Sequence, residues 1–336
     1  MEITSSAPAK VILFGEHSVV YDKLGIAGAV NPRTNITIKE NNKLKICLSD
    51  YKENITTTFD EISCTLNKIE KLQKERKYQD LKVLSGNRIL MIKTVIGKAL
   101  NKKECRPFEL KIKSNIHIGG FGSGSAIFAS TAAAVQLFSR QKLDKQKIAE
   151  AANLGDTICH GGTPSGIDAS AVTYGGYIEF QKSRGLNPIQ IKNKLPVVIG
   201  ITGIPAKTSE TVPHVRELKE KNPEKMNKHL NEMHNIAIEG IKNIKKGNME
   251  KVGSLMNENQ NHLEQIEVSH SKLEKLISAS LNAGALGAKL SGGGGGGIMI
   301  ALCRPEDQER VAQAIEKAGG TSLITEMGVE GVRKEL

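Results

Sequence analysis

The stretch from residue 116 to residue 126 reads Ile-His-Ile-Gly-Gly-Phe-Gly-Ser-Gly-Ser-Ala. It follows a segment rich in β-formers and precedes an Ala-rich segment, so it predicts a glycine-rich turn between a strand and a helix. Glycine permits positive φ, which lets successive backbone N–H groups face one anion, and the start of the helix adds a positive dipole end. The stretch therefore favours a phosphate-binding loop, and a tight turn without a ligand is the alternative.

These glycines fit neither of two common nucleotide-binding motifs. A Walker A loop requires G-x-x-x-x-G-K-[ST], and no lysine follows the cluster. A Rossmann fingerprint requires glycine at i, i+2 and i+5, but the third position is Ser125 counted from Gly120 and Ile127 counted from Gly122. Both motifs are therefore excluded at this turn.

A second cluster consists of the six consecutive glycines from Gly292 to Gly297, directly after Lys289-Leu290-Ser291. It precedes a predicted strand instead of a helix, which again excludes the Rossmann motif. Six glycines exceed what the end of a helix requires, so they favour a loop whose backbone closely approaches a ligand or another loop. A flexible hinge is the alternative.

Composition limits the classes of partner. The chain has 336 residues, and at ~150 residues per domain this length predicts about two domains. Lys and Arg number 47 against 36 Asp and Glu, and the net charge of +11 favours an anionic partner: a nucleotide, a nucleic acid or a membrane surface. The lysines are dispersed, no nucleic-acid motif is present, and the longest apolar stretch, residues 126–138, is too short for a bilayer. We therefore expect neither nucleic acid nor membrane among the partners.

The cysteines and the first residues indicate a cytoplasmic protein. The five cysteines are odd in number and include no C-x-x-C pair, which is typical of reduced, mostly buried thiols in an intracellular protein. The first six residues, Met-Glu-Ile-Thr-Ser-Ser, lack the basic and apolar regions of a secretory signal. Localisation in the cytoplasm is the resulting expectation.

Apolar periodicity and the positions of glycine and proline predict an α+β protein. Strands are expected at 10–14, 34–39, 43–48, 109–118, 171–180, 196–200, 298–303 and 322–325. Helices are expected at 87–99, 125–140, 144–160 and 305–318, with a long helical region over 212–283. Asp144 is the expected N-cap of the helix at 144–160, and Gly161 its stop. Composition changes between residues 181 and 196, which predicts an N-terminal domain of residues 1–185 and a C-terminal domain of residues 186–336.

Several polar residues are candidates for chemistry. Lys10 begins an apolar strand, where a charge is costly unless it is used or paired. Asp168 lies in a turn-rich stretch after the helix that carries Asp156, and Asp156 with the Ser125 hydroxyl offers hard oxygen ligands for Mg²⁺. Taken singly, Lys10 and Asp168 also suit structural roles. Together, a phosphate cradle, Mg²⁺, a carboxylate and a lysine suggest phosphoryl transfer.

Four stretches resemble the motifs of one kinase family. They are residues 8–17, Pro-Ala-Lys-Val-Ile-Leu-Phe-Gly-Glu-His; the glycine turn at 119–126; residues 160–168, His-Gly-Gly-Thr-Pro-Ser-Gly-Ile-Asp; and residues 289–297, Lys-Leu-Ser followed by six glycines. In order and content they resemble the GHMP kinases, named for galactokinase, homoserine kinase, mevalonate kinase and phosphomevalonate kinase. The resemblance runs from residue 5 to about residue 325. Within the family, Phe-Gly-Glu-His-Ser-Val-Val-Tyr at 14–21 and Thr-Tyr-Gly-Gly at 173–176 are similar to the archaeal mevalonate kinases.

The resemblance implies a GHMP kinase fold. Its N-terminal domain is expected to be like ribosomal protein S5 domain 2 and its C-terminal domain ferredoxin-like, with ATP and substrate in the cleft between them. The implied activity is ATP-dependent phosphorylation of the 5-hydroxyl of mevalonate, in the mevalonate pathway of isoprenoid biosynthesis. ATP and mevalonate are then the expected ligands, and Mg²⁺ is the expected cofactor. A homodimer is the expected assembly, because dimers are common in the family.

The resemblance also implies roles residue by residue. Asp168 is expected to receive the proton of the 5-hydroxyl, beside Lys10, which favours the alkoxide and keeps Asp168 ionised. Ser125 is expected to ligate Mg²⁺, and Asp156 takes the place of the family's Mg²⁺-binding Glu. The other expected binding residues are, for substrate, Glu16, His17 and Thr208, the last near the phosphates; for ATP, Gly119, Gly120, Gly122, Ser123, Gly124, Ser125 and Ala126; and in the third motif loop, Ser291, Gly292, Gly293 and Gly294.

The chain departs from the family pattern at several positions. The second motif usually reads P-x-G-x-G-L-G-S-S-A, whereas residues 117–126 read H-I-G-G-F-G-S-G-S-A. Phe121 stands where glycine is usual, and it either hinders the approach of the backbone to phosphate or packs on the nucleotide. Asp156 is shorter than Glu, so it contacts Mg²⁺ directly or through a water molecule. Gly293 stands where alanine is common.

Two other functions remain open from the sequence. A sister kinase of the same family would act on phosphomevalonate, on the 3-hydroxyl of mevalonate or on another small alcohol. A catalytically silent ligand sensor built on the same fold is the second alternative, although a sensor has no need for both Lys10 and Asp168.

Overall fold

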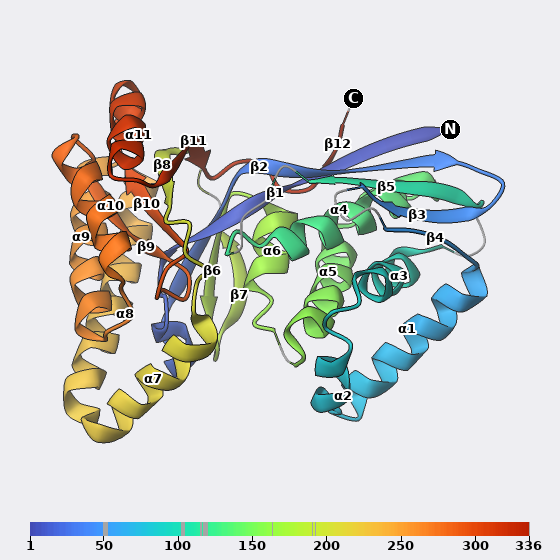
Figure 1. Ribbon diagram of the computed structural model, residues 1–336, viewed down its shortest axis with the longest axis horizontal. Coiled ribbons are helices and arrows are strands. Elements are labelled where there is room, and N and C mark those ends of the chain that lie inside the picture. The colour runs from blue at the N-terminus through green and yellow to red at the C-terminus, as the bar shows by residue number, and fades with distance from the viewer. Residues whose placement is uncertain are drawn as a thin grey trace. The chain divides into compact units, whose positions relative to one another are not determined.

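The computed structural model divides the chain into two compact units that are interleaved in sequence (Figure 1). It describes residues 1–49, 53–101, 105–114, 116, 120–162, 164–189, 191 and 193–335. Unit 1 comprises Met1–Ala9, Pro32–Gly175 and Glu330–Leu336, and unit 2 comprises Lys10–Asn31 and Gly176–Val329. The sequence predicts a single boundary after residue 185, whereas the two units cross that boundary. The reason is that two long strands, β1 (Glu2–Phe14) and β2 (Gly25–Glu40), each continue from one unit into the other.

Unit 1 is a mixed sheet with helices packed on it (Figure 1). The strand order is β4 (Glu53–Thr57), β3 (Leu44–Leu48), β5 (Phe108–Ser114) and β2; β3 and β5 are parallel and the other neighbours antiparallel. The short strand β12 (Arg333–Lys334) pairs with β1, so the last described residues complete this unit. Its helices are α1 (Phe59–Lys74), α2 (Tyr78–Val83), α3 (Arg88–Ala99), α4 (Ser123–Phe138), α5 (Lys145–His160) and α6 (Ile167–Tyr174).

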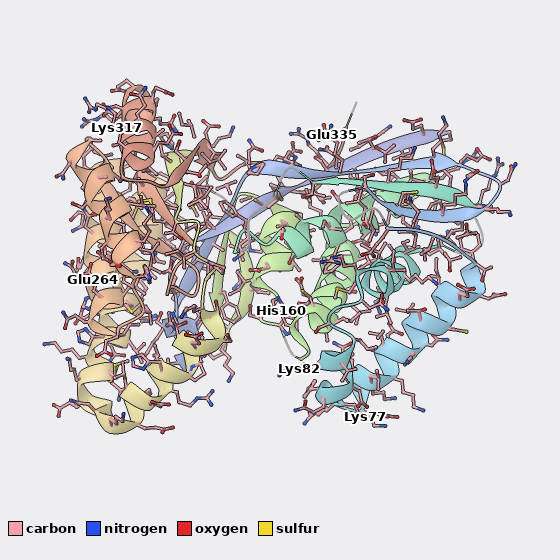
Figure 2. All side chains as sticks on the ribbon, viewed as in Figure 1. Lys77, Lys82, His160, Glu264, Lys317 and Glu335 are labelled. Atoms are coloured by element: carbon pink, nitrogen blue, oxygen red, sulfur yellow. The ribbon has the colours of Figure 1, made fainter. Side chains whose placement is uncertain are left out.

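The ends of α5 confirm two local predictions. The Asp144 side chain accepts a hydrogen bond from the backbone N–H of Lys147 at 3.1 Å, as an N-cap does. Gly161 ends the helix in the left-handed conformation, at φ 60°. A Cβ at Gly161 would lie 2.7 Å from Cβ of Lys82 on α2, so this stop also permits close packing of α2 near His160 (Figure 2).

Unit 2 contains an antiparallel sheet with strand order β11 (Thr321–Met327), β8 (Leu195–Ile201), β10 (Ile298–Leu302) and β9 (Gly287–Ser291). Helices connect β8 to β9, a hairpin connects β9 to β10, and another helical segment leads to β11. This is the βαββαβ order of a ferredoxin-like domain, as predicted. The helices are α7 (Thr208–Lys221), α8 (Pro223–Lys246), α9 (Met249–Gln265), α10 (Ser271–Asn282) and α11 (Gln308–Lys317), with short 3₁₀ turns η1 (Ser18–Tyr21) and η3 (Pro305–Asp307).

Two further strands and an edge complete unit 2. β6 (Tyr177–Gln181) pairs with the first residues of β2 and with β7 (Gly185–Ile189). β9 ends the strand order, and side chains of α9 satisfy its outer edge: Asn257 accepts from the N–H of Ala288 at 2.9 Å, and Gln260 from that of Leu290 at 3.0 Å. These bonds fix the strand that leads into the second glycine cluster.

Two predictions from the sequence are wrong. Residues 171–180 are not one strand, because α6 extends to Tyr174 and β6 begins only at Tyr177. Gly166, in the left-handed conformation, starts this helix, and Gly175, at φ 73°, ends it. The thiols are all free but mostly not buried: among the five cysteines, only Cys303 is buried.

Within the described part of the chain, no helix combines the length and the apolar character needed to cross a membrane. The apolar stretch at 126–138 lies within α4.

Candidate active site

The second glycine cluster is the hairpin loop between β9 and β10 in unit 2. Five of its six residues, Gly292 and Gly294 to Gly297, have positive φ values between 66° and 139°, which side chains other than glycine rarely adopt. The loop is bonded to neighbouring backbone: Lys207 N–H donates to Gly294 O at 3.0 Å, and Gly297 N–H donates to Ile204 O at 2.7 Å. The cluster is therefore a loop packed closely on other segments of unit 2, and these bonds do not fit a free hinge.

Gly293 has ordinary φ, and its lack of a side chain has a steric reason. A Cβ at this position would lie 2.0 Å from Oγ1 and 2.7 Å from Cβ of Thr208, the first residue of α7. The Gly293 carbonyl accepts a hydrogen bond from Thr211 Oγ1 at 2.8 Å. The structure thus places Thr208 against the third motif loop. Thr208 and Gly293 are both among the binding residues that the family resemblance implies.

His17 contacts the same loop from the segment after β1. Its Nε2 lies 2.9 Å from the carbonyl oxygen of Gly293, and because a carbonyl only accepts, Nε2 carries the proton. Burial lowers the pKa of His17, which favours the neutral ring. The neutral ring with a proton on Nε2 leaves Nδ1 as a hydrogen-bond acceptor.

Glu16 and Lys289 form an ion pair whose side chains are both fully buried. Burial raises the pKa of Glu16 and lowers that of Lys289, and in each case the charge of the partner opposes the shift. Glu16 also lies within electrostatic reach of Lys10, which is 5% exposed on β1. Lys289 had no predicted role, although the argument made for Lys10, that a lysine inside an apolar strand needs a partner, applies equally to it.

The first glycine cluster lies at the start of α4 in unit 1. Gly119 lies outside the described residues. Gly120 and Gly122 have φ values of 93° and 68°, and α4 begins at Ser123 with no side chain capping its first N–H groups. A helix start preceded by left-handed glycines is suited to bind an anion. The Phe121 side chain is 1% exposed, so its ring contributes to the interior and not to the surface of the loop.

Behind this loop, Ser125 and Asp156 form a buried pair between α4 and α5. Ser125 Oγ donates to Asp156 Oδ2 at 2.6 Å, and both residues are at most 3% exposed. Gly124 and Ala126 flank Ser125 in the first turn of α4. The structure therefore brings the two predicted metal-binding residues together.

Asp168 lies in the first turn of α6, after the left-handed Gly166. Desolvation raises the pKa of the Cys159 thiol on the last turn of α5, and the charges of Asp156 and Asp168 raise it further. Both carboxylates are thus within electrostatic reach of one thiol in unit 1.

The donor set in unit 1 fits Mg²⁺ only as a partial site. Among the described residues, no group of three His, Cys, Asp or Glu side chains is arranged to hold a metal ion. Mg²⁺ in kinases commonly takes one or two protein oxygens and completes its shell with phosphate oxygens and water. The Ser125 hydroxyl and the Asp156 carboxylate are oxygen donors of this kind, beside a loop suited to phosphate.

Two family models match the chain in the expected order. Residues 90–176 match "GHMP kinases N terminal domain", and residues 241–321 match "GHMP kinases C terminal". The chain is therefore a kinase of the GHMP class, whose members use ATP, and the predicted GHMP kinase fold is confirmed.

Full-length relatives define the family more narrowly. The chain is 38% identical to the mevalonate kinase of Thermococcus gammatolerans and 36% identical to that of Pyrococcus furiosus, in each case over 100% of this chain and 99% of the relative. A crystal structure of a mevalonate kinase matches with a TM-score of 0.80 at 26% identity, over 98% of this chain and 100% of the other. The chain belongs to the mevalonate kinase family.

Proposed function

We propose that this protein transfers the γ-phosphoryl group of ATP to the 5-hydroxyl of mevalonate, as a step of the mevalonate pathway. The observation that carries the proposal is the full-length identity of 38% to a mevalonate kinase, which covers both units and all four motifs. The retention of Lys10 and Asp168, one in each unit, supports catalysis over a silent sensor.

Asp168 acts as the base of the reaction. Its carboxylate accepts the proton of the mevalonate 5-hydroxyl while that oxygen forms a bond to the γ-phosphorus of ATP. The bond between the γ-phosphorus and the bridging oxygen breaks, and ADP leaves with the electron pair. Lys10 favours the developing alkoxide by its positive charge.

The first glycine cluster and the pair behind it serve the triphosphate. Backbone N–H groups at the start of α4, with no side-chain cap, bind the phosphate oxygens. Ser125 and Asp156 hold Mg²⁺, which neutralises phosphate charge when bound. The hydrogen bond between these two residues orients both oxygens before ATP arrives.

His17 binds substrate through its free nitrogen. Because Nε2 is engaged by the Gly293 carbonyl, Nδ1 accepts a hydrogen bond from a hydroxyl group of mevalonate. Thr208, which packs on the same loop, contributes a hydroxyl near the phosphates.

Replacement of Asp168 tests the base. Asp168→Asn removes the proton acceptor but keeps the shape of the side chain, so we expect kcat to fall about 10²–10⁴-fold with measurable mevalonate binding. Asp60→Asn, at an exposed carboxylate in the first turn of α1, is the control and should keep kcat. Turnover near wild type in Asp168→Asn would show that the base is assigned wrongly.

Replacement of Lys10 separates catalysis from binding. Lys10→Met should lower kcat more than it raises KM, because the lysine stabilises charge that develops in the reaction. Lys43→Met, at an exposed lysine, serves as the control. An increase in KM alone would make Lys10 a binding residue.

A panel of alcohols tests the substrate. Mevalonate, phosphomevalonate and other small alcohols are offered with ATP and Mg²⁺ in a coupled assay for ADP, and the product is analysed for phosphorylation at the 5- or the 3-hydroxyl. Mevalonate 5-phosphate is the expected product. Turnover of another alcohol without turnover of mevalonate would favour a sister kinase.

Titration of Mg²⁺ tests the metal site. Ser125→Ala and Asp156→Ala should each raise the Mg²⁺ concentration needed for half-maximal rate. If only Ser125→Ala does so, the family's carboxylate role belongs to another residue.

We also propose a cytoplasmic location and a homodimer. The odd number of cysteines, with no C-x-x-C pair among them, supports the first, and the family resemblance supports the second. Cell fractionation and light scattering after size-exclusion chromatography test them, and a monomer at micromolar concentration would refute the dimer.

A further inference from the structure

The buried pair of Glu16 and Lys289 is unusual among the ion pairs of the described residues. Both side chains have 0% exposure, whereas the pairs Arg33–Glu335, Lys93–Glu61 and Arg310–Asp307 each include partly exposed partners. The Lys289 ammonium also donates to the backbone carbonyl of Leu290 at 2.7 Å. Glu16 Oε2 is buried and has no hydrogen-bond partner in the structure, so the carboxylate relies on the ammonium of Lys289 at Oε1, with a smaller electrostatic contribution from Lys10.

The pair joins two segments that are far apart in sequence. Glu16 directly follows β1 and Gly15, and Lys289 lies in the middle of β9. Two neighbouring contacts join the same segments: Ser291 Oγ accepts from the N–H of Ile12 and donates to its carbonyl, both at 2.9 Å, and His17 Nε2 donates to Gly293 O. The ion pair is the fully buried member of this set of three.

The glycine loop depends on such external contacts for its position. It has no side chains between Gly292 and Gly297, so it cannot pack by itself, and its left-handed residues have high backbone freedom when unrestrained. The strand before it is fixed by Lys289 and Ser291, and Gly293 is fixed by His17 and Thr211. Displacement of Glu16 would therefore move both His17, its neighbour in sequence, and the start of the loop.

We propose that Glu16 and Lys289 form a positioning pair, which holds His17 and the third motif loop in the geometry for substrate binding. Glu16 then acts through Lys289 and does not contact substrate. This assignment differs from the role that the family resemblance implies for Glu16, and it rests on the proposed function.

The experiment is a double-mutant cycle of Glu16→Gln, Lys289→Met and both together. Each single change leaves one charge buried without its partner, so each should lower the melting temperature clearly. The double variant has no unpaired charge and should recover most of the loss, because buried pairs are often replaceable by neutral groups. Lys194→Met, in the exposed pair with Glu326 at 3.0 Å, is the control and should change neither stability nor kinetics.

Kinetics of the double variant distinguish positioning from a purely structural role. We expect its KM for mevalonate to stay raised about tenfold or more while kcat falls less, because small displacements of binding groups are costly. Full recovery of both melting temperature and KM would overturn the proposal. If the single variants do not fold, the double variant alone still decides the point.

The single variants distinguish positioning from direct contact. A positioning pair predicts that Glu16→Gln and Lys289→Met raise KM alike, whereas a substrate contact at Glu16 predicts the effect only in Glu16→Gln. Lys289→Met should also add a pH dependence of KM that wild-type protein lacks, since Glu16 loses the larger of the two lysine charges, Lys289 and Lys10, that oppose the rise of its pKa. This dependence should be absent from the double variant, and its presence there would contradict the assignment.

Failure of the proposed function is recognised separately. Wild-type protein is assayed first with mevalonate, and no turnover there would refute the function. The thermal cycle of the four proteins needs no substrate, and equal melting temperatures throughout would refute the pair.

Discussion

Gly293 provides a sharp test of how the third motif loop packs. The backbone of Gly293 is compatible with alanine, because its φ is not positive. Alanine is also common at this position in the family pattern. In this chain, however, the added Cβ would lie 2.0 Å from Thr208 Oγ1, 2.7 Å from Thr208 Cβ and 3.0 Å from Thr208 Cα. Gly293→Ala should therefore be destabilising here for steric reasons alone.

The magnitude follows from which atoms can move. Rotation of the Thr208 side chain relieves the contact with Oγ1, but Cβ and Cα belong to the first turn of α7 and move only with the helix. Overpacking of this kind costs about 1–3 kcal/mol. In a unit of this size, each kcal/mol lowers the melting temperature by about 2–4 °C.

The assay measures thermal unfolding and ATP kinetics of three variants: Gly293→Ala, Thr208→Gly and the combination of the two. Thr208→Gly removes both Oγ1 and Cβ, so Gly293→Ala combined with Thr208→Gly should lose at least ~1 kcal/mol less than the sum of the two single changes. Gly86→Ala, where an added Cβ meets no atom within 4 Å, is the control and should change stability by less than ~0.5 kcal/mol. A wild-type melting temperature in Gly293→Ala, or strict additivity in the double variant, would refute the packing described here.

Three further predictions use other parts of the two units. Gly124→Ser should be tolerated, with unchanged or higher thermal stability and a KM for ATP within about twofold, because its Cβ would meet only Phe128 Cε2 at 3.7 Å in a helical turn; a large loss of ATP affinity would contradict this. Gly155→Ala should lower the free energy of unfolding by about 1–3 kcal/mol, because its Cβ would lie 2.5 Å from the Phe128 ring, and chemical denaturation measures it. The Nδ1 atoms of His229 on α8 and His262 on α9 lie 3.0 Å apart. Burial lowers the pKa of both side chains, and the charge of His262 lowers that of His229 further. The unfolded chain then binds more protons than the folded one below pH ~6.5, so stability should fall as pH decreases through this range, and less so in His262→Gln; equal slopes in melting temperature against pH would refute it.

Local features were predictable where one segment carries the whole signal. The helix α5 is an example, because Asp144, the apolar face and Gly161 all lie within its own sequence. The strand predicted at 171–180 failed because Val172, Thr173 and Tyr177 favour strands, while Gly166 and Gly175, both at positive φ, set the actual ends of a helix. Those conformations depend on packing that composition does not encode.

The interleaving of the units was not predictable from a change of composition. Residues 25–28 pair with β6, and Val30 pairs with Met327 of β11, almost 300 residues further along the chain. The candidate residues were found through their motifs, but the partner of Glu16 was not. In the sequence, nothing distinguishes Lys289 from the other residues of the third motif. Its pairing with Glu16 becomes visible only in the structure, where β9 lies beside the end of β1.

The pairing of β12 with β1 affects the order in which the two units can complete their folding during synthesis. Unit 2 ends at Val329, whereas unit 1 also includes the segment Glu330–Leu336, which follows it. Arg33 bonds the carbonyls of Glu330 and Gly331 at 2.8 and 2.6 Å, and Ser5 pairs with Lys334. During synthesis from the N-terminus, unit 1, which contains the first residues, therefore stays incomplete until the ribosome has released the segment of β12, which follows all of unit 2. Until then, the edge of β1 that receives β12 stays open to other strands.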